Sequence, residues 1–147
     1  TMPIIGAAIV ADRDDLINDL INFGKEIGLA FQITDDVLDL TEGKGRGEIG
    51  RDIKEGKRSM MVVHCLSKCT KNEKHEIISI LNRAPVDTRN EDVLYVKSLF
   101  EKYGSIKYAQ QKAELYSEKA KKIADSMPPK LKEVLYFFAD YIVKRKK

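Results

Sequence analysis

The feature that most constrains the fold is a helical repeat of apolar residues through residues 14–40. One face of this stretch carries Leu16, Leu20, Phe23, Ile27, Phe31 and Leu38, at spacings of three, four and seven. This spacing predicts an amphipathic α-helix whose marked face is buried. Asp12, Asp14 and Asp15 lie near its start, where carboxylates cap free N–H groups and suit the helix dipole.

The rest of the chain continues this helical pattern. It has four prolines and no alternating run of β-branched residues bounded by turn residues. Further helices are predicted over residues 58 to 68 or 69, 72–82, 90–103, 105–127 and 131–143, with breaks at Pro85, Gly104 and Pro128-Pro129. The sequence therefore predicts an all-α helical bundle of six or seven helices. Its length suits a single domain over residues 1–147.

Composition excludes several classes of protein. The chain is 43% hydrophobic and 33% charged, which is unlike a disordered tract, a collagen or a disulfide scaffold. No apolar run reaches about 18 residues, so no membrane span is expected. With 26 basic and 23 acidic residues the net charge is +3, which gives little reason to expect nucleic-acid binding.

The cysteines and the first residues indicate the compartment. Two cysteines, Cys65 and Cys69, cannot form a disulfide framework. Residues 1–11 are apolar but lack the basic start and clear cleavage site of a signal peptide. We therefore expect a reduced, cytoplasmic protein.

The segment that indicates chemistry holds three carboxylates within five residues. Asp35 and Asp39 are four residues apart and so project from one helical face, with Asp36 beside them. Asp35 also continues the line of Ile27 and Phe31, the face expected to be buried. Clustered buried carboxylates are costly unless a cation holds them, and Mg²⁺ prefers oxygen ligands. The alternative is that these residues cap the helix end and face solvent.

A second pattern lies a short distance further along the chain. Five of the nine glycines lie between residues 43 and 56, and Lys57 and Arg58 follow directly. A flexible loop that brings cations close to a carboxylate cluster suits a phosphate-bearing substrate.

Together the two patterns are F-Q-x-x-D-D-x-x-D over residues 31–39 and G-x-D-I-x-E-G-K-x-S over residues 50–59. This pair resembles the second aspartate-rich region of trans-prenyl diphosphate synthases, a family that includes farnesyl and geranylgeranyl diphosphate synthases. The Pro128-Pro129 break and the basic end after an aromatic-rich helix are similar to the family's C-terminal part. The resemblance implies the C-terminal half of the isoprenoid-synthase fold.

The resemblance also implies roles at a catalytic centre. Asp35, Asp36 and Asp39 would bind Mg²⁺, with Asp35 as the foremost direct ligand. Lys57 would hold the allylic diphosphate, and Asp35 and Lys57 would be the catalytic residues. The implied reaction condenses isopentenyl diphosphate with an allylic diphosphate to give a longer isoprenoid diphosphate of geranylgeranyl or farnesyl type.

Other residues would bind the substrates by the same resemblance. Phe31 and Gln32 would line the site near isopentenyl diphosphate, and the basic tail at residues 144–147, including Arg145, would approach it. Glu48 stands where the family often has a basic residue in the glycine-rich loop, and Lys44 or Arg46 could take that role.

The chain departs from the family by carrying only the second aspartate-rich motif, because Asp12-Arg13-Asp14-Asp15 lacks the spacing of the first. The resemblance therefore covers about half of the family's fold. We expect a partner that supplies the N-terminal half, a homo- or hetero-oligomer, and an isolated chain that is inactive. The alternative is a non-catalytic regulatory or binding subunit of the same fold. Product length is left open, because the family sets it near the first motif.

Two further groups of residues invite a functional interpretation. His64, Cys65, Cys69 and His75 could suggest zinc, but their spacing favours small core residues and surface histidines. Tyr136, Phe137, Phe138 and Tyr141 are expected to pack in the core, and the alternative is a wall of a prenyl pocket.

Overall fold

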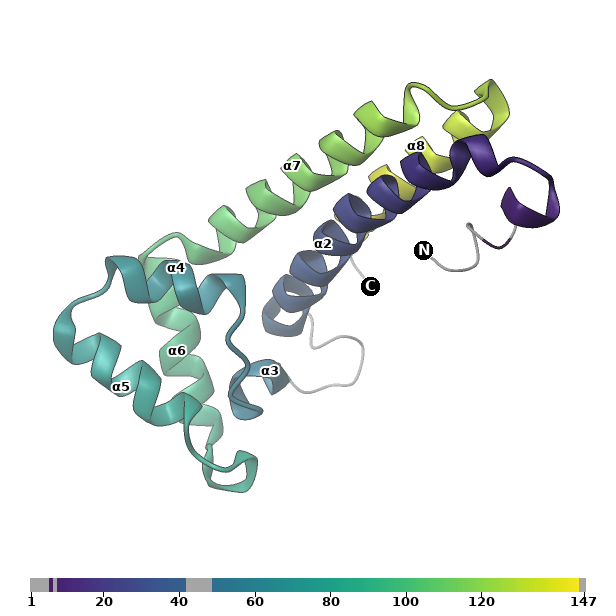
Figure 1. Ribbon diagram of the computed structural model, residues 1–147. Helices are drawn as coiled ribbons and strands as arrows, with labels where there is room; N and C mark the ends of the chain where they lie inside the picture. The colour runs from purple at the N-terminus through teal and green to yellow at the C-terminus, as the bar shows by residue number, and fades with distance from the viewer. Residues whose placement is uncertain (1–5, 7, 42–48, 146–147) are drawn as a thin grey trace. The chain divides into compact units, whose positions relative to one another are not determined.

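The computed structural model describes residues 6, 8–41 and 49–145, and no strand occurs within these ranges (Figure 1). The elements in order are the 3₁₀ turn η1 (Asp14–Leu16), α2 (Ile17–Thr41), α3 (Arg51–Lys54), α4 (Met60–Lys68), α5 (Lys71–Leu81), η3 (Pro85–Asp87), α6 (Asn90–Lys102), α7 (Ser105–Ala124) and α8 (Pro129–Lys144). The prediction of an all-α fold is confirmed.

All six helices predicted from sequence are present, with small shifts at their ends. The first predicted helix begins as η1 and becomes α-helical at Ile17. The second predicted helix begins at Met60, because Ser59 is its N-cap and its hydroxyl accepts from the Val62 N–H. Helix α3 and the turn η3 were not expected, since each is a single short turn inside a segment rich in glycine or containing proline.

The described residues form two compact units. Unit 1 takes its residues from Thr1–Gln32 and Lys112–Arg145, and unit 2 consists of the described residues of Ile33–Gln111. The prediction of a single domain stays a prediction.

Unit 1 is built from the first part of α2, the second part of α7, and α8, which run side by side (Figure 1). Its buried core consists of Ala8, Leu20, Phe23, Ala120, Ala124, Met127 and Leu135. Small residues on α7 let the neighbouring helices approach closely. The Ser117 hydroxyl donates to the Ala139 carbonyl at 2.9 Å, which ties α7 to α8.

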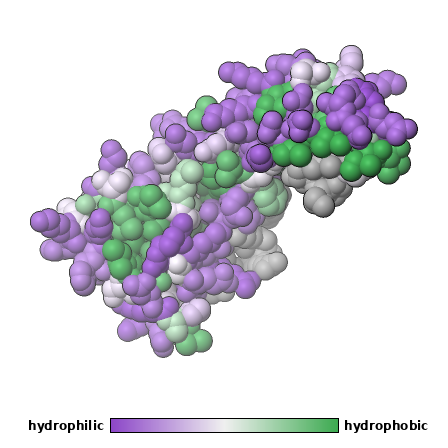
Figure 2. All heavy atoms as spheres, viewed as in Figure 1, coloured by the Kyte–Doolittle hydropathy of each residue, from purple (hydrophilic) through white to green (hydrophobic). Residues whose placement is uncertain are grey.

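Unit 1 also has a shallow apolar pocket of about 310 Å³ next to the start of α2. It is lined by Ala8, Ala11, Arg13, Leu16, Leu20, Pro128, Lys130 and Leu131. Figure 2 shows apolar residues gathered among polar ones in this region. Among the described residues of unit 1, apolar surface thus remains uncovered at this end of α2.

In unit 2, α6 contacts both α3 and α4, and α3 also contacts α5. The end of α2 is hydrogen-bonded to the start of the α3 segment. Its apolar interior includes Ile53, Met61, Ile77, Val96 and Phe100. Helix α5 starts at a capping box, in which Thr70 and Glu73 satisfy each other's backbone N–H groups. Unit 2 carries the aspartates and the lysine of the two motifs.

The prediction of which face of α2 is buried is wrong near the aspartates. Phe31 is 44% exposed and Asp35 is half-buried, whereas Asp36 and Asp39 are buried. The reason lies in the packing within unit 2. Ile33, Val37 and Leu40 form the buried face of this part of α2. Asp36 falls between them, and Asp35 does not.

The expected core packing of the aromatic residues on α8 is also wrong for three of them. Phe137, Phe138 and Tyr141 are 66%, 48% and 53% exposed, while Tyr136 packs against the core of unit 1. Leu135 and Ala139 already fill the buried face of α8, so the neighbouring positions point away from it. We call Val134, Phe137, Phe138 and Tyr141 the aromatic face of α8.

Cys65 and His75 lie as the sequence predicts, in the core and at the surface, and His64 lies between these two environments. Cys65 is buried, which fits a small core residue, and its burial is the main cause that raises its thiol pKa to about 11. His75 is exposed. His64 is half-buried rather than fully exposed. Its Nδ1 is 3.0 Å from the Ser105 hydroxyl and its ring stacks on Tyr108.

No helix in the described part of the chain is both long and apolar enough to cross a membrane.

Candidate active site

The candidate site lies at the end of α2, where three aspartates follow one another within two helical turns. Asp36 and Asp39 are only 6% and 1% exposed, and Asp35 is half-buried. Burying carboxylates away from water is costly unless donors or cations compensate the charge. The contacts of these residues therefore decide what the site can do.

Asp39 is held by the segment that follows the glycine-rich stretch. Its carboxylate accepts from the Asp52 N–H at 2.9 Å, and its carbonyl accepts from the Gly50 N–H at 2.9 Å. Gly50 has a φ of 77°, in the left-handed region that favours glycine. The sequence pattern thus places a glycine where the chain must turn back onto α2.

Lys57 supplies a cation to the site. Its Nζ donates to Asp36 Oδ1 at 2.5 Å and to Asp52 Oδ2 at 3.0 Å. Burial of the ammonium lowers its pKa, but hydrogen bonds and attraction from Asp36 and Asp52 outweigh this, and the pKa of Lys57 lies above its ordinary value. Lys57 is therefore protonated at neutral pH and still about one-third exposed, at 35% of its side chain.

Gly56 fixes the backbone directly before this lysine. Its φ is 67°, and a Cβ at this position would lie 2.3 Å from the Leu81 carbonyl oxygen. Only glycine fits here without a shift of the backbone. The close approach to Leu81 thus explains why the motif has a glycine directly before the lysine.

The carboxylate oxygens at this site suit a hard divalent cation, although they do not form a complete coordination site. Within the described residues, no three carboxylate, histidine or cysteine side chains are grouped to hold a metal ion. Asp36 and Asp39 already accept from Lys57 and from the Asp52 backbone. Mg²⁺ typically uses only one or two carboxylates, together with water and substrate phosphates, so Asp35 and its neighbours remain a fitting partial site. The metal roles of Asp35, Asp36 and Asp39 stay predictions.

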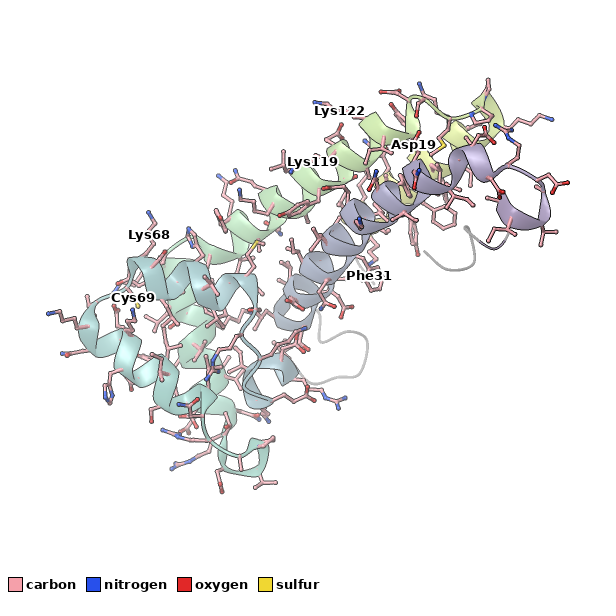
Figure 3. All side chains as sticks on the ribbon, viewed as in Figure 1. Asp19, Phe31, Lys68, Cys69, Lys119 and Lys122 are labelled. Carbon is pink, nitrogen blue, oxygen red and sulfur yellow. The ribbon has the colours of Figure 1, made fainter. Side chains whose placement is uncertain are left out.

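Two of the residues expected to bind substrate meet in unit 1. The Arg145 guanidinium lies 4.4 Å from the centre of the Phe31 ring, a cation–π contact. Phe31 points outward from α2 (Figure 3), and Gln32 next to it is also exposed. The pairing brings a cation and an apolar ring together, but the substrate roles of the three residues stay predictions.

Some expectations fall outside the described residues. These are Glu48, its possible replacements Lys44 and Arg46, and the tail residues Lys146 and Lys147. Lys144, the last residue of α8, forms an ion pair with Asp140 at 2.9 Å.

Sequence reasoning gave no role to Asp52, although it stands in the second motif. Its carboxylate contacts Lys57 and its N–H donates to Asp39. The spacing of five residues to Lys57 across a glycine turn could have suggested this contact, but the turn geometry was not readable from sequence.

Comparisons with known proteins place this chain in one family. Residues 1–100 match the sequence profile of the Polyprenyl synthetase family. The chain is 30% identical to a geranylgeranyl diphosphate synthase of Saccharolobus solfataricus, over 97% of this chain and 44% of that protein. It is 33% identical to a short chain isoprenyl diphosphate synthase of Methanothermobacter thermautotrophicus, over 95% of this chain and 43% of that protein.

Solved structures agree with the sequence matches. The geranylgeranyl pyrophosphate synthetase of Pyrococcus horikoshii superposes with a TM-score of 0.78 at 34% identity, over 91% of this chain and 41% of that one. The octaprenyl pyrophosphate synthase of Helicobacter pylori gives 0.78 at 28% identity, over 94% and 45%. The chain spans less than half the length of these relatives. With its all-α fold and both motif segments inside the matched region, the chain belongs to the polyprenyl synthetase family.

Proposed function

We propose that this chain supplies half of the active site of a Mg²⁺-dependent prenyltransferase. The reaction condenses isopentenyl diphosphate with an allylic diphosphate to give a longer isoprenoid diphosphate of geranylgeranyl or farnesyl type. The observation that carries the proposal is the protonated Lys57 held beside the aspartates at the end of α2. A cation next to a carboxylate cluster is the arrangement that a metal-bound diphosphate requires.

In this proposal each residue of the site has a part in diphosphate departure. Asp35 would be the direct metal ligand, with Asp36 and Asp39 as further ligands. When bound, Mg²⁺ supplies Lewis-acid stabilisation of the departing diphosphate. Lys57 would bind the diphosphate oxygens and stabilise the charge that grows on them as the allylic C–O bond breaks.

The remaining steps join the two substrates. The double bond of isopentenyl diphosphate attacks the allylic carbon to form the new C–C bond, and a proton is then lost. Phe31 and Gln32 would line the site for isopentenyl diphosphate, and Arg145, packed on the Phe31 ring, would approach its diphosphate. Apolar walls would be needed to keep water from the cationic carbon.

The proposal includes a partner that covers the aromatic face of α8. Four large apolar side chains at spacings of three, four and seven on an outward helix face are the pattern of a packed interface. The relatives have more than twice the matched length, which leaves room for a first half of the fold. We therefore assign this face to packing against such a half, from the same protein or from another chain.

The test is a full-length chimera in which this chain replaces the matched part of the Pyrococcus horikoshii synthetase. The chimera should incorporate labelled isopentenyl diphosphate when Mg²⁺ and an allylic diphosphate are present. Asp35→Ala and Lys57→Ala should each lower kcat about 100-fold or more, as loss of a charge-stabilising group does. Asp87→Ala, an exposed carboxylate of η3, is the control and should act like the parent.

A chimera that is folded by circular dichroism and gel filtration but has no turnover would contradict the catalytic proposal. If it still bound inorganic pyrophosphate with Mg²⁺, the alternative of a non-catalytic binding or regulatory subunit would be favoured.

A further inference from the structure

We propose that Asp52 is a positioning residue, which holds the Lys57 ammonium beside Asp36, where it would meet a diphosphate, and fixes Asp39 in the same contact network. This inference rests on the proposed function for its ligand, a Mg²⁺-bound diphosphate. The positioning of Lys57 itself can be measured without any ligand.

Asp52 contacts Lys57 and Asp39 through three different groups. Its carboxylate lies 3.0 Å from Lys57 Nζ, its carbonyl accepts from the Lys57 N–H at 2.9 Å, and its own N–H donates to the Asp39 carboxylate at 2.9 Å. The lysine is thus held at both its backbone and its tip. The same residue restrains one of the predicted metal ligands.

The need for such a residue follows from the nature of lysine. Its ammonium sits on a flexible four-carbon stem and has no preferred direction of its own. Asp36 contacts the ammonium from α2 and Asp52 contacts it from α3, so two carboxylates on separate elements limit where it can lie. Asp52 is itself largely buried, at 15% side-chain exposure, and this keeps its own position defined.

A competing view makes a prediction of opposite sign. Asp52 is negatively charged and lies beside the ammonium that would bind an anion. If Asp52 only repelled the diphosphate or competed for Lys57, then its removal should strengthen diphosphate binding. If Asp52 positions Lys57, its removal should weaken that binding, although a repulsive charge has been lost.

The experiment compares Asp52→Ala, Asp52→Glu and the control Glu55→Ala in the full 147-residue chain. Glu55 is the C-cap residue of the same short helix and pairs with Arg51 at 2.7 Å, so its substitution removes a nearby charge that does not pair with Lys57. The first measurement is the solvent exchange rate of the Lys57 ammonium protons by ¹⁵N NMR. The second is the affinity for inorganic pyrophosphate in Mg²⁺, by isothermal titration calorimetry.

We expect Asp52→Ala to speed ammonium exchange at Lys57 and to weaken pyrophosphate binding about 10-fold or more, which is the usual size of such indirect effects. Asp52→Glu should restore much of both, and Glu55→Ala should leave both unchanged. Unchanged ammonium exchange, or tighter pyrophosphate binding, in Asp52→Ala would overturn the proposal.

Two further results separate this proposal from the proposed function. If the parent chain binds no pyrophosphate but Asp52→Ala still speeds exchange at Lys57, then the positioning role stands and the diphosphate site is overturned. If Asp52→Ala loses helix content, the same two measurements are made on Asp52→Asn, which keeps the shape of the side chain but not its charge.

Discussion

At the scale of single residues, Lys57 and Glu73 of unit 2 are each held by several partners, but the two networks have different roles. Lys57 bridges Asp36 and Asp52 in the candidate site. Glu73 accepts from Lys102 at 2.7 Å, from the Tyr103 hydroxyl at 2.6 Å and from both Thr70 donors at the start of α5. The first network lies in the candidate site, and the second joins α5 to α6.

Because of the Glu73 network, we expect the free energy of unfolding to fall at acidic pH. Hydrogen bonds from Lys102, Tyr103 and Thr70 lower the pKa of Glu73 from 4.5 to about 2. Because the folded pKa is the lower one, the stabilisation is complete above about pH 5 and is lost as the pH falls toward 2. Urea unfolding at pH 7 and pH 3 should show a smaller pH dependence for Glu73→Gln than for the parent. Glu101→Gln, an exposed carboxylate on α6, should keep the parent's dependence.

Lys57 should also contribute to stability. Lys57→Ala removes the cation beside the buried Asp36 carboxylate. A buried carboxylate that loses a charge partner destabilises the folded state. Since the lysine is partly exposed and its ion pairs are screened by water, we expect a loss of about 1–2 kcal/mol in the free energy of unfolding. Lys71→Ala, at an exposed position of α5, is the control in the same urea experiment. Equal losses in both variants would contradict the expectation.

At the scale of the elements, glycines with the same backbone geometry are predicted to differ because of their surroundings. Gly56 and Gly104 have φ values of 67° and 66°, but a Cβ on Gly56 would meet the Leu81 carbonyl and a Cβ on Gly104 would meet nothing within 4 Å. Gly104→Ala should therefore cost only the backbone strain, about 1 kcal/mol.

Gly56→Ala should cost clearly more, about 2 kcal/mol or above, because the backbone must also shift away from Leu81. Thermal and urea unfolding of the two variants test this pair. If Gly56→Ala is no worse than Gly104→Ala, the close approach of Gly56 to Leu81 is not rigid.

Sequence could predict the helices but not which of their faces are covered. Helical spacing, caps and breaks are local, so all six helices were found to within a few residues at their ends. Burial depends on which elements pack together. That information decided that Asp36, and not Asp35, joins the buried face of α2, and that Phe137 lies outside the core. The contact of Asp52 with Lys57 was hidden for the same reason, because it depends on how the chain turns at Gly50 and Gly56.

At the scale of the whole molecule, the family match and the exposed apolar side chains agree with each other. The chain spans 44% of its Saccharolobus relative, and its last helix exposes the aromatic face defined above. Both observations are the basis of the proposal that a first half of the fold packs against this face.

The aromatic face should make the isolated chain self-associate. Phe137→Ser combined with Tyr141→Ser should lower the average mass measured by light scattering at high protein concentration, because it removes much of the exposed apolar surface. Val86→Ser, at an exposed position in η3, is the matched control and should leave the mass unchanged. The same double variant in the chimera should reduce stability if the face packs against the first half.

The isolated chain should bind Mg²⁺ and pyrophosphate weakly and turn over no substrate, because it carries only one aspartate-rich motif. Product assays with radiolabelled isopentenyl diphosphate check this, with the denatured mass of every polypeptide in the sample measured alongside. Sustained turnover by a preparation that contains only the 147-residue chain would contradict it.

The hydrogen bonds that join Asp39 to Gly50 and Asp52 have a consequence for how such a sequence can vary. Asp39 receives the N–H groups of both Gly50 and Asp52, so the start of α3 is fastened to α2 independently of the number of residues between them. Doubling the length of a connection costs only about 0.6 kcal/mol of loop-closure entropy. Insertions and deletions between residues 42 and 48 should therefore be tolerated, and even a proteolytic cut there should leave Lys57 in register with α2.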